Sequence, residues 1–128
     1  MDLTKTPGQL ATEAADAIRA LNHRTLDKGS YDNPAEAGAA AYALRTLVER
    51  LPQSLTQLGT ALTAFDDDTA IRTDDGSDAT YSVAECLAAI EAAHEHLGQL
   101  LGELAIVSAR TSHMGGHWSA DEDDVDAE

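Results

Sequence analysis

Residues 83–108 read VAECLAAIEAAHEHLGQLLGELAIVS, and the spacing of their apolar side chains decides the fold class. Steps of four and three residues alternate along this series, which comprises Val83, Leu87, Ile90, His94, Leu97, Leu101, Leu104 and Ser108. The same alternation holds upstream for Ala37, Ala41, Leu44, Val48, Leu51, Leu55, Leu58, Leu62 and Phe65. A repeat of about 3.5 residues places each series on one side of its helix and requires a partner helix. The sequence therefore predicts two long helices that pack together.

The composition indicates one soluble all-α domain. The chain has 128 residues, of which 43% are hydrophobic and only 4% aromatic. Most of the hydrophobic residues are Ala and Leu, which have the highest helix propensities. The sequence contains no apolar run of membrane-spanning length and no positively charged start followed by an apolar core, so we expect neither a membrane helix nor a secretory signal. The cytoplasm is the expected compartment.

The acidic charge is concentrated in two segments. The net charge is −15, which argues against direct binding of nucleic acid or anionic lipid, because phosphate binding requires a basic surface. Residues 66–78 hold six Asp against one Arg, and residues 121–128 hold six acidic residues and no base. The first two helical segments are balanced in charge, and the third carries a modest acidic excess from Glu85, Glu91, Glu95 and Glu103. We therefore expect the helix faces to serve for packing.

Helix-capping patterns mark where each helix begins. A capping residue precedes a Glu or Gln by three positions at Thr6–Gln9, Asn33–Glu36 and Ser82–Glu85, although Asp78 or Thr80 could cap the third helix one turn earlier. Lys28-Gly29 and Gly115-Gly116 are stop signals. Helices are expected over residues about 7–27, 34–66 and 80–113. Residues 1–114 are expected to form a single helical domain, and residues 115–128 an acidic flexible tail.

Two features shape the expected helical hairpin. Pro52 lies inside the second helix, beside the apolar series and facing outward, and we expect one kinked helix rather than two helices joined at a corner. The segment 66–80 contains the turn signal Asp75-Gly76 and is expected to be a solvated connection. Its Asp spacing does not fit a calcium loop. The second and third helices would then form a long antiparallel hairpin.

A hairpin of two helices buries little apolar surface, so further packing is expected. The shorter first helix can cover part of one side, and apolar residues outside the two series indicate a second buried face. We expect a homodimer that forms a helical bundle. The expected interface residues are Leu44, Leu47, Leu58, His94, Leu100, Leu101, Val107 and Trp118. Trp118 is the only tryptophan, and it adjoins the acidic residues of the tail.

Candidate chemistry is limited to histidine and one cysteine. Glu91 and His94 have the i, i+3 spacing of di-iron bundles, but no second such pair and no further seam carboxylate exists, so we predict a packing histidine that sets the helix register. His113 and His117 flank a glycine break, which favours a flexible helix end. Cys86 is expected to be a half-buried apolar residue. We predict no catalytic residue, no metal site and no cofactor.

Two short segments carry a family resemblance. AIRALNHRTL at residues 17–26 and RLPQSLTQL at residues 50–58 resemble small uncharacterised Ala/Leu-rich helical proteins of actinobacteria and their mobile elements. These proteins have no assigned activity, so the resemblance implies no functional residue. It implies a bacterium with a GC-rich genome as the source of the acidic, alanine-rich composition.

Two functions fit these observations. The first is a non-enzymatic module for protein–protein interaction or assembly, which binds another helical protein or a second copy of itself. The alternative is an acidic inhibitor that occupies the nucleic-acid site of a basic partner protein. Such a mimic needs carboxylates spread along a face, whereas the first two helices are balanced in charge. The sequence therefore favours the assembly module.

Overall fold

The computed structural model describes residues 1–116, and within that range every regular element is a helix. The helices are α1 (Pro7–Arg24), α2 (Pro34–Asp67) and α3 (Ala79–Thr111). The expected three-helix, all-α fold is confirmed. The chain divides into two compact units, one containing Met1–Ala37 and one containing Gly38–Met114, and each is described by itself.

The first unit contains α1, whose N-terminus is capped as the sequence predicts. The Oγ1 atom of Thr6 accepts a hydrogen bond from the backbone N–H of Gln9 at 3.1 Å. In return, the backbone N–H of Thr6 donates to Gln9 Oε1 at 2.9 Å, which completes the capping box. The helix ends at Arg24 instead of continuing to residue 27, because Thr25 leaves the helical conformation and its hydroxyl donates to the carbonyl of Leu21 at 2.8 Å.

Helix α2 is a single helix that passes through Pro52 without a break. At its N-terminus Asn33 Oδ1 accepts from the backbone N–H of Glu36 at 2.9 Å, which confirms the predicted cap. The Glu36 carboxylate accepts from the backbone N–H of Asp32 at 2.7 Å, one residue before the position that a capping box would use. One continuous helix is therefore observed, and the kink at Pro52 stays a prediction.

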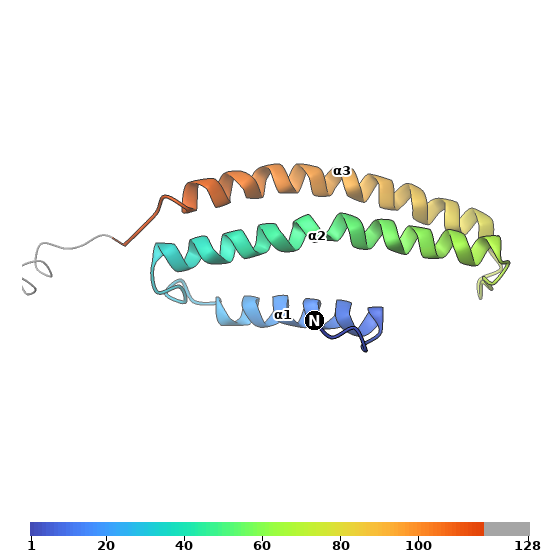
Figure 1. Cartoon of the computed structure of the whole chain (residues 1–128), viewed down its shortest axis with the longest axis horizontal. Coiled ribbons are helices and arrows are strands. Elements are labelled where there is room, and N and C mark those ends of the chain that lie inside the picture. Colours follow the sequence, from blue (N-terminus) through green and yellow to red (C-terminus); the bar gives the residue numbers. More distant parts are fainter. Residues whose placement is uncertain (117–128) are drawn as a thin grey trace, which may run out of the picture. The chain divides into compact units, whose positions relative to one another are not determined.

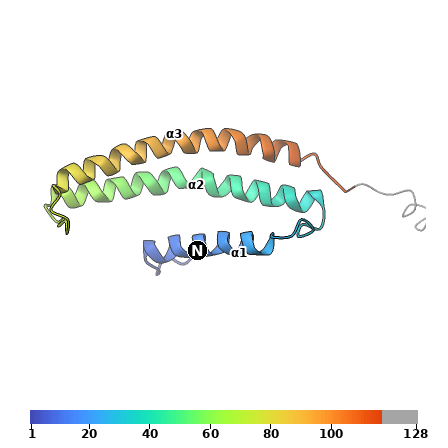
Figure 2. The same cartoon turned by 180° about the vertical axis from the view of Figure 1, so that it is seen from behind.

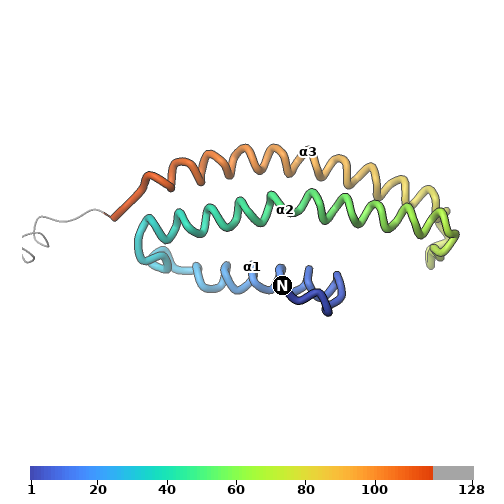
Figure 3. The backbone as a smooth tube through the Cα atoms, viewed as in Figure 1, coloured from blue at the N-terminus to red at the C-terminus, as the bar shows by residue number. Residues whose placement is uncertain are grey.

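In the second unit α2 and α3 lie side by side, and residues 68–78 join them at one end (Figures 1 and 2). Gly59 lies against Leu87 and Ile90, and Gly38 lies against Thr111 at the other end of the pair. The tube in Figure 3 shows α3 running back along α2. Only four helix residues in the described range are buried, and they are Val48, Gly59, Val83 and Ser108. A pair of helices therefore leaves much of its apolar surface exposed.

The connection between α2 and α3 is held by its own polar side chains. Gly76 has a φ of 78°, a conformation that residues with a Cβ rarely adopt, so the predicted turn at this glycine is confirmed. Asp75 Oδ1 accepts hydrogen bonds from both the backbone N–H and the hydroxyl of Ser77. Asp78 then caps α3 by accepting from the N–H of Tyr81 at 2.9 Å. The sequence offered Ser82, Asp78 and Thr80 as candidate caps for this helix, and in the structure the cap is Asp78.

The face that α2 presents to α3 differs from the expected one. Val48 is buried and Leu55 and Leu62 are half-buried, as expected from the apolar series. Leu44 is half-buried as well, but the other large members of that series are exposed, with exposed fractions of 38% for Leu51, 52% for Leu58 and 54% for Phe65. Their places beside α3 are taken by the residues that follow each of them, and these are the half-buried Pro52, the buried Gly59 and the half-buried Asp66.

The expectation that Pro52 faces outward is therefore wrong. Its carbonyl oxygen lies 3.1 Å from Nε2 of His94 on α3. The reason for the difference is the small size of Gly59. A Cβ added to Gly59 would lie only 3.1 Å from Leu87 Cδ2, so only glycine permits this close approach without a shift. The closely packed side of α2 is thus the side of Pro52 and Gly59, and Leu51, Leu58 and Phe65 lie on its flank.

Candidate functional site

Five of the large apolar side chains that α2 and α3 expose share one side of the helix pair, which we call the leucine face. It consists of Leu51, Leu58, Phe65, Leu100 and Val107, which have exposed fractions of 38%, 52%, 54%, 44% and 47%. The α2 members are spaced by seven residues, and so are the two α3 members. Seven residues correspond to about two helical turns, so each set lies along one side of its helix.

Both sets lie on the same side of the helix pair. On α2, Leu58 precedes Gly59, which faces α3, by one residue. On α3, Val107 precedes the buried Ser108 by one residue. One residue corresponds to a rotation of about 100° around a helix axis. Because α3 runs opposite to α2, an equal rotation about both axes points both side chains to the same side of the pair.

Seven of the eight sequence-predicted interface residues lie in the described part of the chain, and they fall into three groups. Leu58, Leu100 and Val107 are exposed and belong to the leucine face. Leu44 and Leu47 are half-buried on α2. His94 and Leu101 are half-buried on the side of α3 that packs against α2. Trp118, the acidic tail and His117 lie outside the described residues.

His94 contacts the backbone of α2 at the proline. Its Nε2 atom lies 3.1 Å from the carbonyl oxygen of Pro52 and 3.4 Å from Oγ1 of Thr56. A carbonyl oxygen only accepts hydrogen bonds, so Nε2 carries the hydrogen and donates it to Pro52. The imidazole therefore ties α3 to one position along α2. This contact supports a packing role for His94.

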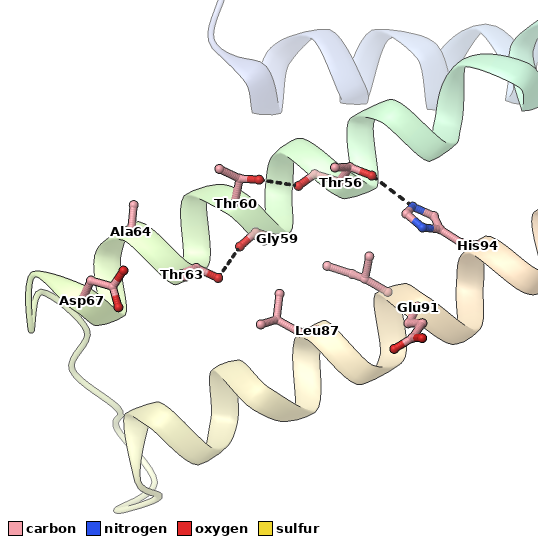
Figure 4. A pocket seen from close by; sticks show the side chains of 10 residues that line it. Thr56, Gly59, Thr60, Thr63, Ala64, Asp67, Leu87, Glu91 and His94 are labelled. Atoms are coloured by element: carbon pink, nitrogen blue, oxygen red, sulfur yellow. Dashed lines mark hydrogen bonds between the residues drawn. The ribbon is translucent and has the colours of Figure 1, made fainter.

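A groove lies on the opposite side of the pair from the leucine face. It has a volume of about 530 Å³, and Figure 4 shows Thr56, Thr60 and Thr63 on its α2 wall and Leu87, Glu91 and His94 on its α3 wall. Two of the threonine hydroxyls donate to carbonyls of their own helix, Thr60 to Thr56 and Thr63 to Gly59, each at 3.0 Å. Those two hydroxyl hydrogens are consequently engaged within α2.

The described residues offer few groups for catalysis or metal binding. No group of three or more His, Cys, Asp or Glu side chains in residues 1–116 is placed to hold a metal ion. Within the same residues, the hydrogen bonds of His94 go to Pro52 and Thr56, and none joins it to a carboxylate. Cys86 is exposed, which corrects the expectation of a half-buried thiol. It lies seven residues before Ala93 and fourteen before Leu100, on the same side of α3.

Charged side chains border the leucine face without entering it. Arg50 precedes Leu51, and Glu103 follows Leu100 by three residues; both are exposed. The ion pairs in residues 1–116 are Lys5 with Glu13, and Arg45 with Glu49 at 2.9 Å, so Arg50 and Glu103 have no partner there. An apolar centre bordered by charge is the usual composition of a protein interface.

Reasoning from the sequence missed two members of this surface. The apolar series predicts Leu51 and Phe65 in the contact between the two long helices, but they are exposed. The signal that could have placed them is Gly59, because a glycine in the middle of a long helix indicates a close approach of another segment.

Comparisons with known proteins found no matching family model, no matching curated protein and no matching solved structure. Within the described residues, no helix combines the length and hydropathy needed to cross a bilayer.

Proposed function

We propose that this protein is a non-enzymatic module for protein–protein interaction, and that the leucine face is the surface with which it binds another helical protein. The observation that supports this function is the exposure of five large apolar side chains on one side of the α2–α3 pair. Burying one Leu or Phe completely contributes about 1.5–3 kcal/mol. Large apolar side chains exposed together on one face of a protein are typical of a binding site.

The architecture behind this function is an antiparallel hairpin of α2 and α3. The close contacts between the two helices support it. They place the residues of the leucine face on two packed helices and not on loops. Sites on regular elements keep their geometry better than sites on loops. A kink at Pro52 and packing of α1 on the hairpin complete the proposed arrangement.

The test compares two substitutions at neighbouring positions of α2. Leu58→Asp places a charge in the centre of the leucine face, whereas Gln57→Asp places the same charge at an exposed position beside it. Each protein is used to capture partners from the source cell, and captured proteins are then purified and measured for direct binding. We expect Leu58→Asp to abolish binding, Gln57→Asp to retain it, and binding to persist at high salt.

The opposite pattern would support the acidic-inhibitor alternative. In that case the partner would be basic, binding would weaken steeply with salt, and Leu58→Asp would bind as well as Gln57→Asp. Circular dichroism of both variants serves as the folding control. Loss of binding in both variants with intact helices would contradict the assignment of the site to the leucine face.

A further inference from the structure

We infer that the partner on the leucine face is a second copy of this chain, arranged so that α2 of each copy lies along α3 of the other. The two-fold axis then runs parallel to the helices. This inference rests on the proposed function of the leucine face. It adds the identity of the partner and the pairing of the helices.

The two helices contribute side chains of different size to this side of the pair. In the half of the pair that adjoins the connection, α2 contributes the large residues Leu58 and Phe65. On α3, the half that adjoins the connection to α2 contributes the small residues Cys86, Ala89 and Ala93. Facing helices pack best when large side chains meet small ones. The difference in size therefore favours α2 packing on α3 of the partner over α2 packing on α2.

The register of α2 against α3 fixes the height of each side chain, by which we mean its position along the helix axes. Gly59 lies against Leu87 and Ile90, so Leu58 is level with the region of Ile90 on α3. A two-fold axis parallel to the helices leaves every residue at its own height. Leu58 of one copy would then enter the space between Ala89 and Ala93 of the other. The opposite pairing would place Leu58 against large residues of α2.

The charges at the border also fit this pairing. In the proposed dimer the edge of α2 that bears Arg50 runs beside the edge of α3 that bears Glu103. Counted from His94 beside Pro52 and from Gly38 beside Thr111, Glu103 lies about four to seven residues, or about 6–10 Å, from the height of Arg50 along the helices. Long side chains bridge such offsets at the borders of helical bundles. These two groups have no ion-pair partner within residues 1–116 of one copy.

The dependence of binding on salt concentration distinguishes a second copy of this chain from a basic partner protein. Each copy carries a net charge of −15, so two copies repel each other at low ionic strength. Added salt screens that repulsion and leaves the apolar contact intact. We therefore expect the dimer to tighten as salt is added, whereas a complex with a basic protein would weaken.

The native cysteine allows a direct test of the pairing. Cys86 is exposed on the leucine-face side of α3, and Ala61 is exposed on α2 three residues after Leu58. In the proposed dimer, Cys86 of one copy lies within about two residues of the height of Ala61 of the other. Ala61→Cys should therefore form two symmetrical disulfides per dimer on oxidation with diamide, which takes up the two electrons and two protons of each thiol pair.

Matched variants serve as controls for the cross-link. Ala64→Cys also places a thiol at an exposed alanine of α2, but it lies in the groove on the opposite side of the pair. We expect Ala61→Cys to give a covalent dimer on a non-reducing gel, and Ala64→Cys to remain a single chain. The Ala61→Cys dimer should disappear when Cys86→Ser is added.

Sedimentation equilibrium of the unmodified chain provides a second measurement. We expect a mass twice the 13.5 kDa of one chain. Leu58→Asp should weaken the dimer by at least about 100-fold, because the dimer would bury an unpaired charge, and Gln57→Asp should leave it unchanged. A monomeric chain would overturn the inference, as would a covalent dimer that persists with Cys86→Ser, or none with Ala61→Cys. A monomer that still binds a different protein through Leu58 would leave the proposed function standing.

Discussion

Replacing Gly59 by alanine tests how closely α2 and α3 approach each other. An alanine in place of a glycine inside a helix stabilises the helix by about 1 kcal/mol. At Gly102 of α3 an added Cβ has no atom within 4 Å, so Gly102→Ala should give this full gain. At Gly59 the same atom would lie 3.1 Å from Leu87 Cδ2 and 3.4 Å from Ile90 Cδ1.

The contact at Gly59 should cancel the gain in helix propensity. Leu87 is 37% exposed beside the groove, so its side chain can move away. Forcing a side chain about 30° from its preferred rotamer costs about 0.5–1.5 kcal/mol. We therefore expect Gly59→Ala to change the free energy of unfolding by less than about 0.5 kcal/mol. Gly59→Leu cannot be accommodated in this way and should destabilise the protein by about 1–3 kcal/mol.

Urea unfolding followed by far-ultraviolet circular dichroism gives the free energies, with all variants at one protein concentration because self-association would raise the apparent stability. Gly102→Leu is the control for the larger side chain, and it should be tolerated. If Gly59→Ala stabilises the protein as much as Gly102→Ala, or if Gly59→Leu is tolerated, then α3 does not pack against this side of α2.

Two further predictions concern polar contacts. His94→Ala removes the hydrogen bond to the Pro52 carbonyl and should lower the free energy of unfolding by about 1–2 kcal/mol. His113→Ala, at an exposed position beyond the end of α3, should change it by less than about 0.5 kcal/mol. Equal effects in urea unfolding would contradict the packing role of His94. Hydrogen bonds from the hydroxyl and, to a smaller extent, from the backbone N–H of Ser77 hold the pKa of Asp75 below its ordinary value. The stability that this carboxylate contributes is therefore present above its unfolded-state pKa and is lost as the pH falls through its folded-state pKa. In Ser77→Ala the pKa of Asp75 should rise toward the ordinary value, which a carboxyl ¹³C NMR titration measures, and an unchanged pKa would show that the hydroxyl is not responsible.

The helix boundaries and caps follow from local sequence. The side chains of Thr6, Asn33 and Asp78 cap the three helices through hydrogen bonds to N–H groups three residues ahead, and such bonds depend only on nearby residues. The turn at Gly76 is local for the same reason. The caps at Thr6 and Asn33 and the turn at Gly76 were predictable because each needs only a few consecutive residues, whereas the sequence left the cap of α3 open between Ser82, Asp78 and Thr80.

The sequence also determined which side of α3 faces α2. From Val83 to Ser108 only one line of residues combines apolar character with helical spacing over its whole length, and its two ends are buried in the structure. For α2, however, the line through Val48, Leu55 and Leu62 has two possible flanks. Leu58 belongs to the larger and more apolar flank, and Gly59 belongs to the other.

The tertiary structure alone decided between those flanks. Hydrophobicity by itself favours burying Leu58, but the distance between two helices depends on the volume of the side chains that separate them. The absent side chain of Gly59 lets Leu87 and Ile90 approach the backbone of α2, and His94 reaches the Pro52 carbonyl in the same register. The sequence thus determined three capped helices with two apolar series. The packing of α3 at Gly59 decided which leucines stay exposed, because close approach is a property of two surfaces together and is not contained in the periodicity of either one.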